Sequence, residues 1–275
     1  MGRGRSIEPA FTPFPAAEPL VSVLIPTRDR PEFLAVALEC WRRQTYANRQ
    51  IIVLDHGAER PVDPATVNAA GAFVSRIPPS PTLGEALNAG VKRAAGPVCL
   101  KADDDDWYGP TFLDEWLSRF TAASSGGEPA LVCATTYLLF DVRRWQIRRG
   151  QAGRFSGATL CFSREAALRA PFRPYARCED AHFYRDQHET AGARLDHVWR
   201  PTSYLAVRHD GGAGNRGHTW TDDNGVAVSD LLLQLDLEPI APEELISPWA
   251  LPFYQRLHRQ LAEAPPDSVS PRLGQ

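Results

Sequence analysis

Short apolar runs alternate with amphipathic stretches over the first hundred residues of the chain. Residues 20–25 (LVSVLI), 50–55 (QIIVLD) and 97–102 (PVCLKA) are mainly apolar and include β-branched side chains, which is typical of strands buried on both faces of a sheet. The stretches between them carry apolar side chains at helical spacing, first after residue 31 and again after residue 82. This alternation predicts an α/β fold in which helices flank a mostly parallel central sheet.

Two short motifs predict where those helices begin. Asp29 and Glu32 have the spacing of a capping box, and Thr82 and Glu85 have the same spacing, so each pair is expected to satisfy free N–H groups at a helix start. Gly96 is expected to end the second helix. The apolar stripe of that helix consists of Leu83, Leu87, Val91 and Ala94.

After residue 110 the pattern no longer alternates regularly. Apolar runs predict strands, and helical spacing predicts helices, but their order indicates a mixed arrangement. The predicted elements are a helix over 110–120, strands over 130–140 and 158–162, a short helix capped by Ser163, a helix over 180–189, strands over 194–199 and 203–208, a glycine-rich loop over 210–220, and helices near 226–236 and 248–263.

Charge and cysteine content narrow the class of protein. The chain has 275 residues with 30 basic and 33 acidic side chains, a net charge of -3, which gives no general attraction to nucleic acid. Its five cysteines are scattered without a CxxC pair, as expected of reduced thiols in a cytoplasmic protein. No run approaches the roughly 18 apolar residues of a transmembrane segment.

The run KADDDDWYGP, residues 101–110, places four aspartates directly after an apolar strand. In an extended segment Asp103 and Asp105 project to one side, and Asp104 and Asp106 to the other. Two carboxylates on one side suit Mn²⁺ or Mg²⁺, which takes its remaining ligands from water and phosphate oxygens. The alternative is a solvated acidic loop.

Three segments in this order, VSVLIPTRDRPEFLAVALECWRRQTY, IIVLDHG and LGEALNAGVKRAAGPVCLKADDDDWYGPTFL, resemble family 2 glycosyltransferases, which have the GT-A fold. The resemblance covers roughly residues 20–120. It implies a nucleotide-diphosphate sugar as donor, with a UDP-sugar as the default, a divalent cation (Mn²⁺ or Mg²⁺) held by a D-x-D motif, and an acceptor hydroxyl on a saccharide or glycoconjugate.

The resemblance also implies roles for individual residues on the donor side. Metal and diphosphate positions fall on Lys101, Asp103 and Asp105, and Asp104 turns toward the ribose, backbone or solvent. Gly90 is explained equally well by close packing of a helix on the sheet, and Arg28 by an ordinary surface position. The residues implied to line the nucleotide and the sugar are Pro26, Thr27, Arg28, Asp55, Gly84 and Asn88.

On the acceptor side the resemblance is looser. The segment CEDAHF resembles the family's ED element, which implies that Asp180, or failing it Glu179, is the general base that takes the acceptor's proton. Acidic residues also favour a helix's first turn through the macrodipole alone. Family members often add a histidine to the metal site, for which His218 is the first choice and His209 the second. Gly157, Ala158 and Thr159 are expected to shape the acceptor side.

The apolar pattern and the resemblance together predict how the chain is divided. The apolar faces late in the chain are interpreted as packing or homo-oligomer contacts first, and as contacts with the inner face of a membrane second. The predicted parts are a flexible leader over 1–18, a GT-A domain over 19–222 with a nucleotide-sugar half (19–120) and an acceptor half (121–222), a helical extension over 223–264, and a flexible tail over 265–275.

These patterns favour a metal-dependent glycosyltransferase that inverts the anomeric configuration. A retaining glycosyltransferase would use the same metal and diphosphate positions. A nucleotidyltransferase is disfavoured because IPTRDRP lacks the glycine-rich phosphate loop expected after its first strand. A non-catalytic GT-A-like module that binds a nucleotide or sugar without turnover is the alternative from a different class.

Overall fold

A computed structural model describes residues 18–78, 82–149, 155–175, 178–209 and 238–263. The predicted leader up to residue 17, the glycine-rich loop, the helix near 226–236 and the tail lie outside these residues, as does His218.

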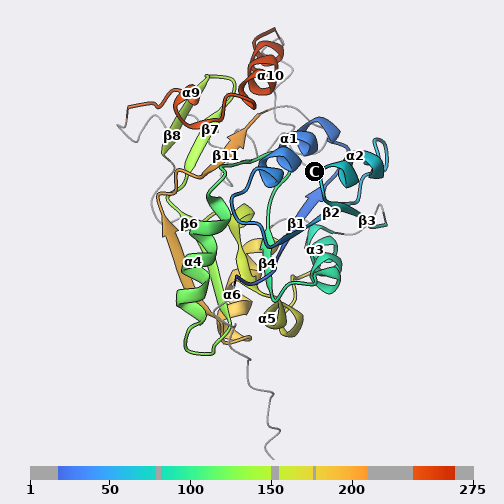
Figure 1. Cartoon of the computed structure of the whole chain (residues 1–275), viewed down its shortest axis with the longest axis vertical. Coiled ribbons are helices and arrows are strands. Elements are labelled where there is room, and N and C mark those ends of the chain that lie inside the picture. The colour runs from blue at the N-terminus through green and yellow to red at the C-terminus, as the bar shows by residue number, and fades with distance from the viewer. Residues whose placement is uncertain (1–17, 79–81, 150–154, 176–177, 210–237, 264–275) are drawn as a thin grey trace, which may run out of the picture.

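The centre of the fold is a seven-stranded sheet with the strand order β10-β6-β9-β4-β1-β2-β3 (Figure 1). Every neighbouring pair in it is parallel except the two that β9 makes with β4 and β6. This confirms the predicted α/β class with a mostly parallel sheet. The strands are β1 (Val21–Thr27), β2 (Arg49–Asp55), β3 (Phe73–Arg76), β4 (Val98–Lys101), β6 (Ala130–Thr135), β9 (Cys161–Ser163) and β10 (Arg194–Trp199).

Helices cover both faces of this sheet because neighbouring residues of each central strand are buried on opposite sides. In β1, Val23 and Ile25 join one core cluster and Leu24 the other, as alternation along a strand requires. The first cluster includes buried side chains of α1 (Pro31–Arg42), α2 (Pro64–Ala69) and α4 (Phe112–Ser124). The second includes buried side chains of α3 (Leu83–Arg93), α5 (Arg164–Arg169) and α6 (Glu179–Glu189).

A smaller sheet with the order β5-β11-β7-β8 lies beside the first one (Figure 1). Its strands are β5 (Trp107–Tyr108), β7 (Leu138–Asp141), β8 (Gln146–Arg149) and β11 (Tyr204–Arg208). Two late helices, α9 (Pro242–Leu245) and α10 (Leu251–Glu263), lie beside it. Tyr254, Leu257 and Leu261 of α10 join the first core cluster, so the apolar face of this helix packs within the chain.

Two predicted strands are wrong in extent. The run over 130–140 forms β6 and β7, which belong to different sheets; Thr136 between them has a left-handed backbone with φ 52°, which turns the chain out of the first sheet. The run over 158–162 is a 3₁₀ turn, η1 (Gly157–Thr159), followed by β9.

Of the predicted helix caps, only the capping box of Thr82 and Glu85 is confirmed, with both reciprocal hydrogen bonds present. The one at Asp29 is wrong: its carboxylate accepts from the backbone N–H groups of Glu59 and Arg60, and α1 begins without a side-chain cap. Ser163 does not cap α5 either, because its hydroxyl accepts from the backbone of β6 instead. The helix expected to end at Gly96 ends at Arg93.

Candidate active site

The carboxyl end of β4 and the first turn of α6 bring acidic and basic side chains together. The Lys101 ammonium is buried and lies 3.0 Å from the Asp103 carboxylate and 3.7 Å from that of Glu179. Burial alone would lower the pKa of Lys101, but these carboxylates and that of Asp180 raise it above its ordinary value. Lys101 is therefore a fixed positive charge at the carboxyl end of β4, between a predicted donor residue, Asp103, and a predicted acceptor residue, Glu179.

Asp180 lies directly against Gly157. A Cβ atom on Gly157 would come within 1.9 Å of the Asp180 Oδ2 atom, so only glycine leaves room for this carboxylate. The neighbouring Glu179 is buried, and burial raises its pKa although Lys101 acts in the opposite direction. Of the two predicted base candidates, Asp180 is the less buried one.

The aspartate run is not extended, and its carboxylates do not alternate in the predicted way. Arg30 donates hydrogen bonds to both Asp104 and Asp105, which were expected on opposite sides. Thr27 donates a further hydrogen bond of 2.6 Å to Asp104. Asp106 points into the fold, where its carboxylate accepts from the Tyr204 hydroxyl at 2.6 Å and from the backbone of β11 at 2.8 Å.

These contacts shift the pKa values of Asp104, Asp105 and Asp106 in different directions. Burial and the nearby carboxylate of Asp105 raise the pKa of Asp104 to about 7 despite Arg30, and burial also raises the pKa of Asp106 to about 7. Burial acts in the same direction on Asp105, but Arg30 and His209 hold its pKa below the ordinary value. Arg30 and His209 therefore favour the charged form of Asp105, whereas burial favours the neutral forms of Asp104 and Asp106.

Tyr108 holds this run against the segment that shapes the acceptor side. Its hydroxyl accepts from the Asp103 backbone N–H at 2.9 Å and donates to the Ala158 carbonyl at 3.0 Å. The ring is fully buried and packs against Trp41 and Phe112. The aspartates and Gly157 are therefore positioned by a shared core residue, which sequence reasoning did not identify.

His209 lies next to the predicted metal carboxylate. Its Nε2 atom is 3.2 Å from the Asp105 Oδ2 atom, and its ring stacks on Phe33 with the centroids 4.2 Å apart. A carboxylate oxygen and an imidazole nitrogen are suitable ligands for Mn²⁺. Among the described residues there is no group of three or more His, Cys, Asp or Glu side chains arranged to hold a metal ion.

The residues predicted to line the nucleotide meet at the ends of β1 and β2, where Thr27 pairs with Asp55, but their side chains have different partners. Thr27 contacts the aspartate run, whereas the Arg28 side chain is 61% exposed and lies 3.9 Å from Asp29. Asp55 is buried, and its carboxylate accepts from two backbone N–H groups and from Arg76 at 2.6 Å. Pro26 pairs with Leu54 in the sheet, one residue before Asp55. Arg30, two residues after Arg28, is the arginine of this turn that reaches the aspartates.

Gly84 and Asn88 hold the segment that precedes α6. A Cβ atom on Gly84 would come within 1.9 Å of the Arg173 carbonyl oxygen. The Asn88 amide exchanges two hydrogen bonds with the Phe172 backbone, at 2.8 and 2.9 Å. Arg173 in turn pairs with Asp186 of α6, so these contacts position the helix that carries Asp180.

The sequence profile of glycosyl transferase family 2 matches residues 22–188. The chain belongs to glycosyl transferase family 2. An uncharacterised glycosyltransferase of Rickettsia prowazekii (strain Madrid E), RP339, is 26% identical over 100 residues, which are 36% of this chain and 31% of that protein. The chain thus spans about a third of the length of this relative.

Solved structures show the same fold at low sequence identity. Mannosyltransferase PcManGT from Pyrobaculum calidifontis, in complex with GDP-Man and Mn²⁺, matches with a TM-score of 0.56 and 16% identity over 96% of this chain and 81% of that one. S. aureus TarS 1–349 in complex with UDP matches with a TM-score of 0.51 and 15% identity over 69% and 61% of the two chains. These likenesses confirm the GT-A fold.

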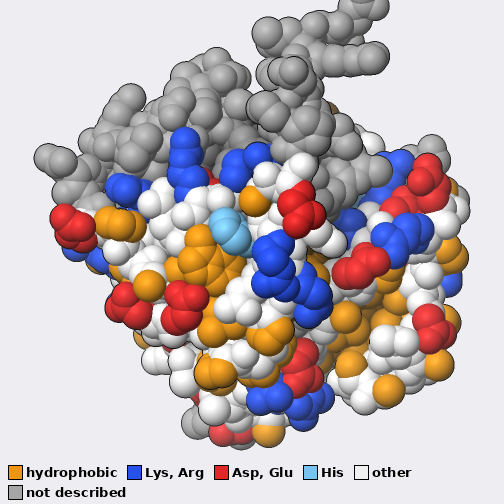
Figure 2. Space-filling view, turned by 90° about the horizontal axis from the view of Figure 1, so that it is seen from above, with side chains coloured by type: hydrophobic (Ala, Val, Ile, Leu, Met, Phe, Trp, Pro, Cys, Tyr) orange, Lys and Arg blue, Asp and Glu red, His pale blue; other side chains and the backbone are white. Residues whose placement is uncertain are grey.

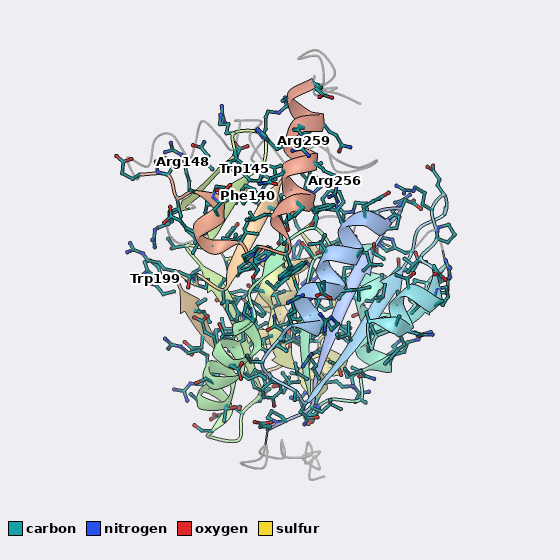
Figure 3. The ribbon with its side chains drawn as sticks, turned by 45° about the horizontal axis from the view of Figure 1, so that its top comes forward. Phe140, Trp145, Arg148, Trp199, Arg256 and Arg259 are labelled. Atoms are coloured by element: carbon teal, nitrogen blue, oxygen red, sulfur yellow. The ribbon has the colours of Figure 1, made fainter. Side chains whose placement is uncertain are left out.

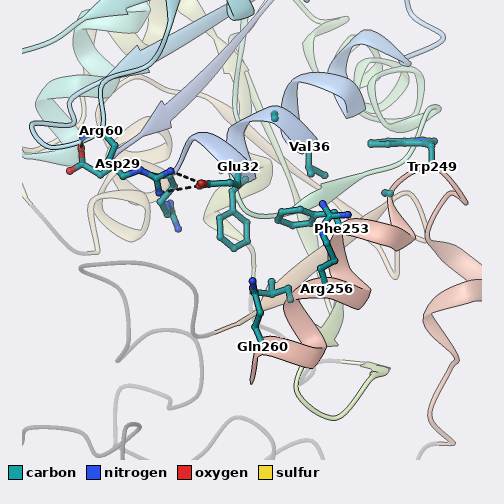
Figure 4. A pocket seen from close by; sticks show the side chains of 13 residues that line it. Asp29, Glu32, Val36, Arg60, Trp249, Phe253, Arg256 and Gln260 are labelled. Atoms are coloured by element: carbon teal, nitrogen blue, oxygen red, sulfur yellow. Dashed lines mark hydrogen bonds and ion pairs between the residues drawn. The ribbon is translucent and has the colours of Figure 1, made fainter. Parts of the chain in front are cut away.

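This family 2 chain also has a cavity of about 680 Å³ between α1 and α10 (Figure 4). Its apolar wall includes Phe33, Val36 and Phe253, and Arg30 and Arg60 add charge. Arg30 also donates to the aspartate run, and Phe33 also stacks on His209, so both residues connect the cavity with the candidate active site. Figure 2 shows basic, acidic and apolar side chains interspersed on the visible face of the molecule. No helix in the described ranges is long and apolar enough to cross a membrane.

Proposed function

We propose that this chain is a metal-dependent glycosyltransferase that moves a sugar from a nucleotide-diphosphate sugar to an acceptor hydroxyl with inversion. One observation carries the proposal. Lys101, the pair of Asp105 and His209, and Asp180 lie near the carboxyl end of β4. Family membership supports the reaction class.

Asp105 and His209 would hold the divalent cation, Mn²⁺ or Mg²⁺. Asp105 fits this role because Arg30 and His209 hold the pKa of its carboxyl below the ordinary value, and His209 supplies a nitrogen 3.2 Å from it. The remaining ligands would come from water and donor phosphates. When bound, the cation supplies positive charge that stabilises the departing diphosphate.

Lys101 and Arg30 supply the fixed positive charge of the site. Both side chains are largely buried and lie against carboxylates of the aspartate run. Preorganised charges in a site shielded from water stabilise a charge that develops in the reaction more than mobile solvent does. Thr27, at the end of β1, and Asp103, at the end of β4, border the same space and would contact the nucleotide.

Asp180 would take the proton from the acceptor hydroxyl while the hydroxyl oxygen bonds to the anomeric carbon. It lies against Gly157, which is part of the 3₁₀ turn η1 that precedes β9. Attack by the activated hydroxyl from the face opposite the leaving diphosphate would give inversion. Glu179 is held by Lys101 and is the weaker candidate for the base.

The donor is proposed to be a UDP-sugar, with a GDP-sugar as the competitor, because solved structures with this fold contain UDP in one case and GDP-Man in another. The acceptor is proposed to be a saccharide or glycoconjugate.

Release of nucleotide from UDP-, GDP-, dTDP- and CDP-sugars, with Mn²⁺ or with a chelator, tests this proposal. We expect Mn²⁺-dependent release by the wild type, a loss of at least a hundredfold in Asp105→Asn, and no loss in Glu165→Gln, which replaces a carboxylate by an amide at a half-exposed position of α5. Full activity of Asp105→Asn would overturn the metal site. Nucleotide binding without release from any donor would favour the non-catalytic module, and product stereochemistry by NMR would separate inversion from retention.

A further inference from the structure

Trp199 is the most exposed large apolar side chain among the described residues, with 55% of its surface open to solvent. It ends β10, the edge strand of the seven-stranded sheet. Figure 3 shows it at the tip of this strand, on the margin of the molecule. A lone exposed aromatic residue is ordinary, so its meaning depends on its neighbours.

The residue that follows fixes the indole. The Arg200 guanidinium lies 5.3 Å from the centroid of the Trp199 ring, which is the distance of a cation–π contact. Arg200 has a left-handed backbone with φ 54°, an uncommon conformation that surrounding structure must stabilise. Its backbone N–H donates to the Thr135 carbonyl at 3.2 Å. One face of the indole is thus covered by a cation, while 55% of the residue's surface remains open to solvent.

The topology places this indole at the carboxyl ends of the parallel strands, where the candidate active site also lies. β4, β6 and β10 run in the same direction, because β9 is antiparallel to both β4 and β6, and β6 is parallel to β10. In the order β10-β6-β9-β4 three strand spacings separate Trp199 from the strand that precedes Asp103, or about 14 Å at the usual spacing. That distance exceeds the width of one sugar ring.

Aromatic side chains lie between Asp180 and Trp199. Tyr184 follows Asp180 by one helical turn and so lies on the same side of α6. Phe155 stacks on Tyr184 with the centroids 4.7 Å apart and forms a bridge with Thr135, the partner of Trp199 in the sheet. The Tyr184 hydroxyl is 2.9 Å from the Nε2 atom of His197, two residues before Trp199.

We propose that Trp199 and Arg200 form a distal acceptor subsite for an oligosaccharide. The C–H face of one sugar ring packs on the open face of the indole, while guanidinium N–H groups donate to its hydroxyls. The chain then runs past Phe155 and Tyr184, and its terminal hydroxyl reaches Asp180. This inference rests on the proposed transferase function, and it makes the acceptor an oligosaccharide, since a single sugar cannot span both ends.

A glycan array tests the subsite. Fluorescently labelled protein is incubated with Mn²⁺ and UDP on printed glucans, galactans, mannans and chito-oligosaccharides of one to six units. The variants are Trp199→Ala, Trp199→Phe and Arg200→Gln. The matched control is Phe73→Ala, which removes an aromatic side chain, itself 40% exposed, from the opposite edge strand, β3. Because Trp199 is exposed, its variants are expected to fold, which thermal unfolding checks.

We expect the wild type and Phe73→Ala to retain at least one series of oligosaccharides but not its monosaccharide. Trp199→Ala should lose at least tenfold in retained signal, Arg200→Gln less, and Trp199→Phe least. Absence of oligosaccharide binding by the wild type, equal binding by Trp199→Ala, or equal binding of monosaccharide and oligosaccharide would overturn the subsite. So would light scattering that shows a wild-type dimer and a Trp199→Ala monomer, because the indole would then contact a second copy.

The two proposals fail in different ways. Nucleotide release from a sugar donor with no binding of oligosaccharides removes the subsite and keeps the transferase. Trp199-dependent binding of oligosaccharides with no release from any donor removes the transferase and leaves a saccharide-binding surface.

Discussion

Arg30 joins Asp104 and Asp105 through one guanidinium group, which donates to a carboxylate oxygen of each. The Arg30 side chain is 17% exposed and that of Asp104 is fully buried. Part of the negative charge of the aspartate run is therefore compensated within the chain by Arg30. Removing the guanidinium would leave two buried carboxylates without their main partner.

Arg30→Gln should lower the free energy of unfolding at pH 7 by about 3 kcal/mol, because breaking one side of a buried charge pair leaves the other side uncompensated. Urea unfolding measures the change. Arg42→Gln, which removes an arginine from an exposed pair with Glu39, is the control and should have little effect. Equal unfolding free energies for the two variants would show that Arg30 does not stabilise the run.

Gly157→Ala should abolish transfer but preserve binding of nucleotide and metal. The new Cβ would come within 1.9 Å of the Asp180 carboxylate, so the side chain or the turn must move. A displacement of the proposed base by about 1 Å is enough to cost a hundredfold in rate. Rates with Asp180→Asn measured alongside give the expected lower limit, and ligand-induced thermal shifts check that the donor side is intact. Wild-type rates in Gly157→Ala would exclude Asp180 as the base in this position.

Strands that are apolar almost throughout are the easiest to predict from the sequence. β1, β2 and β4 are apolar almost throughout and were recognised directly. β3 and β8 are short strands whose residues are largely exposed or half-buried, so they lack an apolar run. The division between β6 and β7 depends on the backbone of Thr136, which no periodicity in the apolar run 130–140 reveals.

The resemblance proposes site residues at strand ends and at the start of a helix, and these remain predictions. Lys101 ends β4, Asp103 and Asp105 lie in the turn after it, and the structure places Glu179 and Asp180 near Lys101. Arg30 contacts carboxylates about 75 residues away along the chain, and in TRDRP it is not distinguishable from Arg28. Only the geometry of the turn after β1 decides which arginine points inward.

Asn88→Ala should destabilise the fold by about 1–3 kcal/mol, since the variant leaves the backbone N–H and C=O of Phe172 without the amide that bonds both. Asn68→Ala, on an exposed position of α2, is the matched control and should change the unfolding free energy by about 0.5 kcal/mol or less. Urea unfolding of both variants makes the comparison. An Asn88→Ala variant as stable as the control would mean that Gly84 packing alone holds the segment before α6.

The pair between Arg173 and Asp186 should make the stability of the α6 region depend on pH. The hydrogen bond from Arg173 lowers the pKa of Asp186 below its model-peptide value of 3.8, although burial acts in the opposite direction. A carboxylate with a lowered folded pKa contributes stability above the unfolded pKa and loses it as the pH falls through the folded pKa. Arg173→Gln should therefore be less stable than the wild type at pH 6, and the difference should shrink as the pH falls below 4.

Urea unfolding at pH 6 and pH 3 measures this difference in stability. The control is Arg169→Gln, which removes the arginine of the exposed pair with Glu165. A difference that stays constant or grows toward pH 3 would contradict the assignment of this stability to the ionised Asp186.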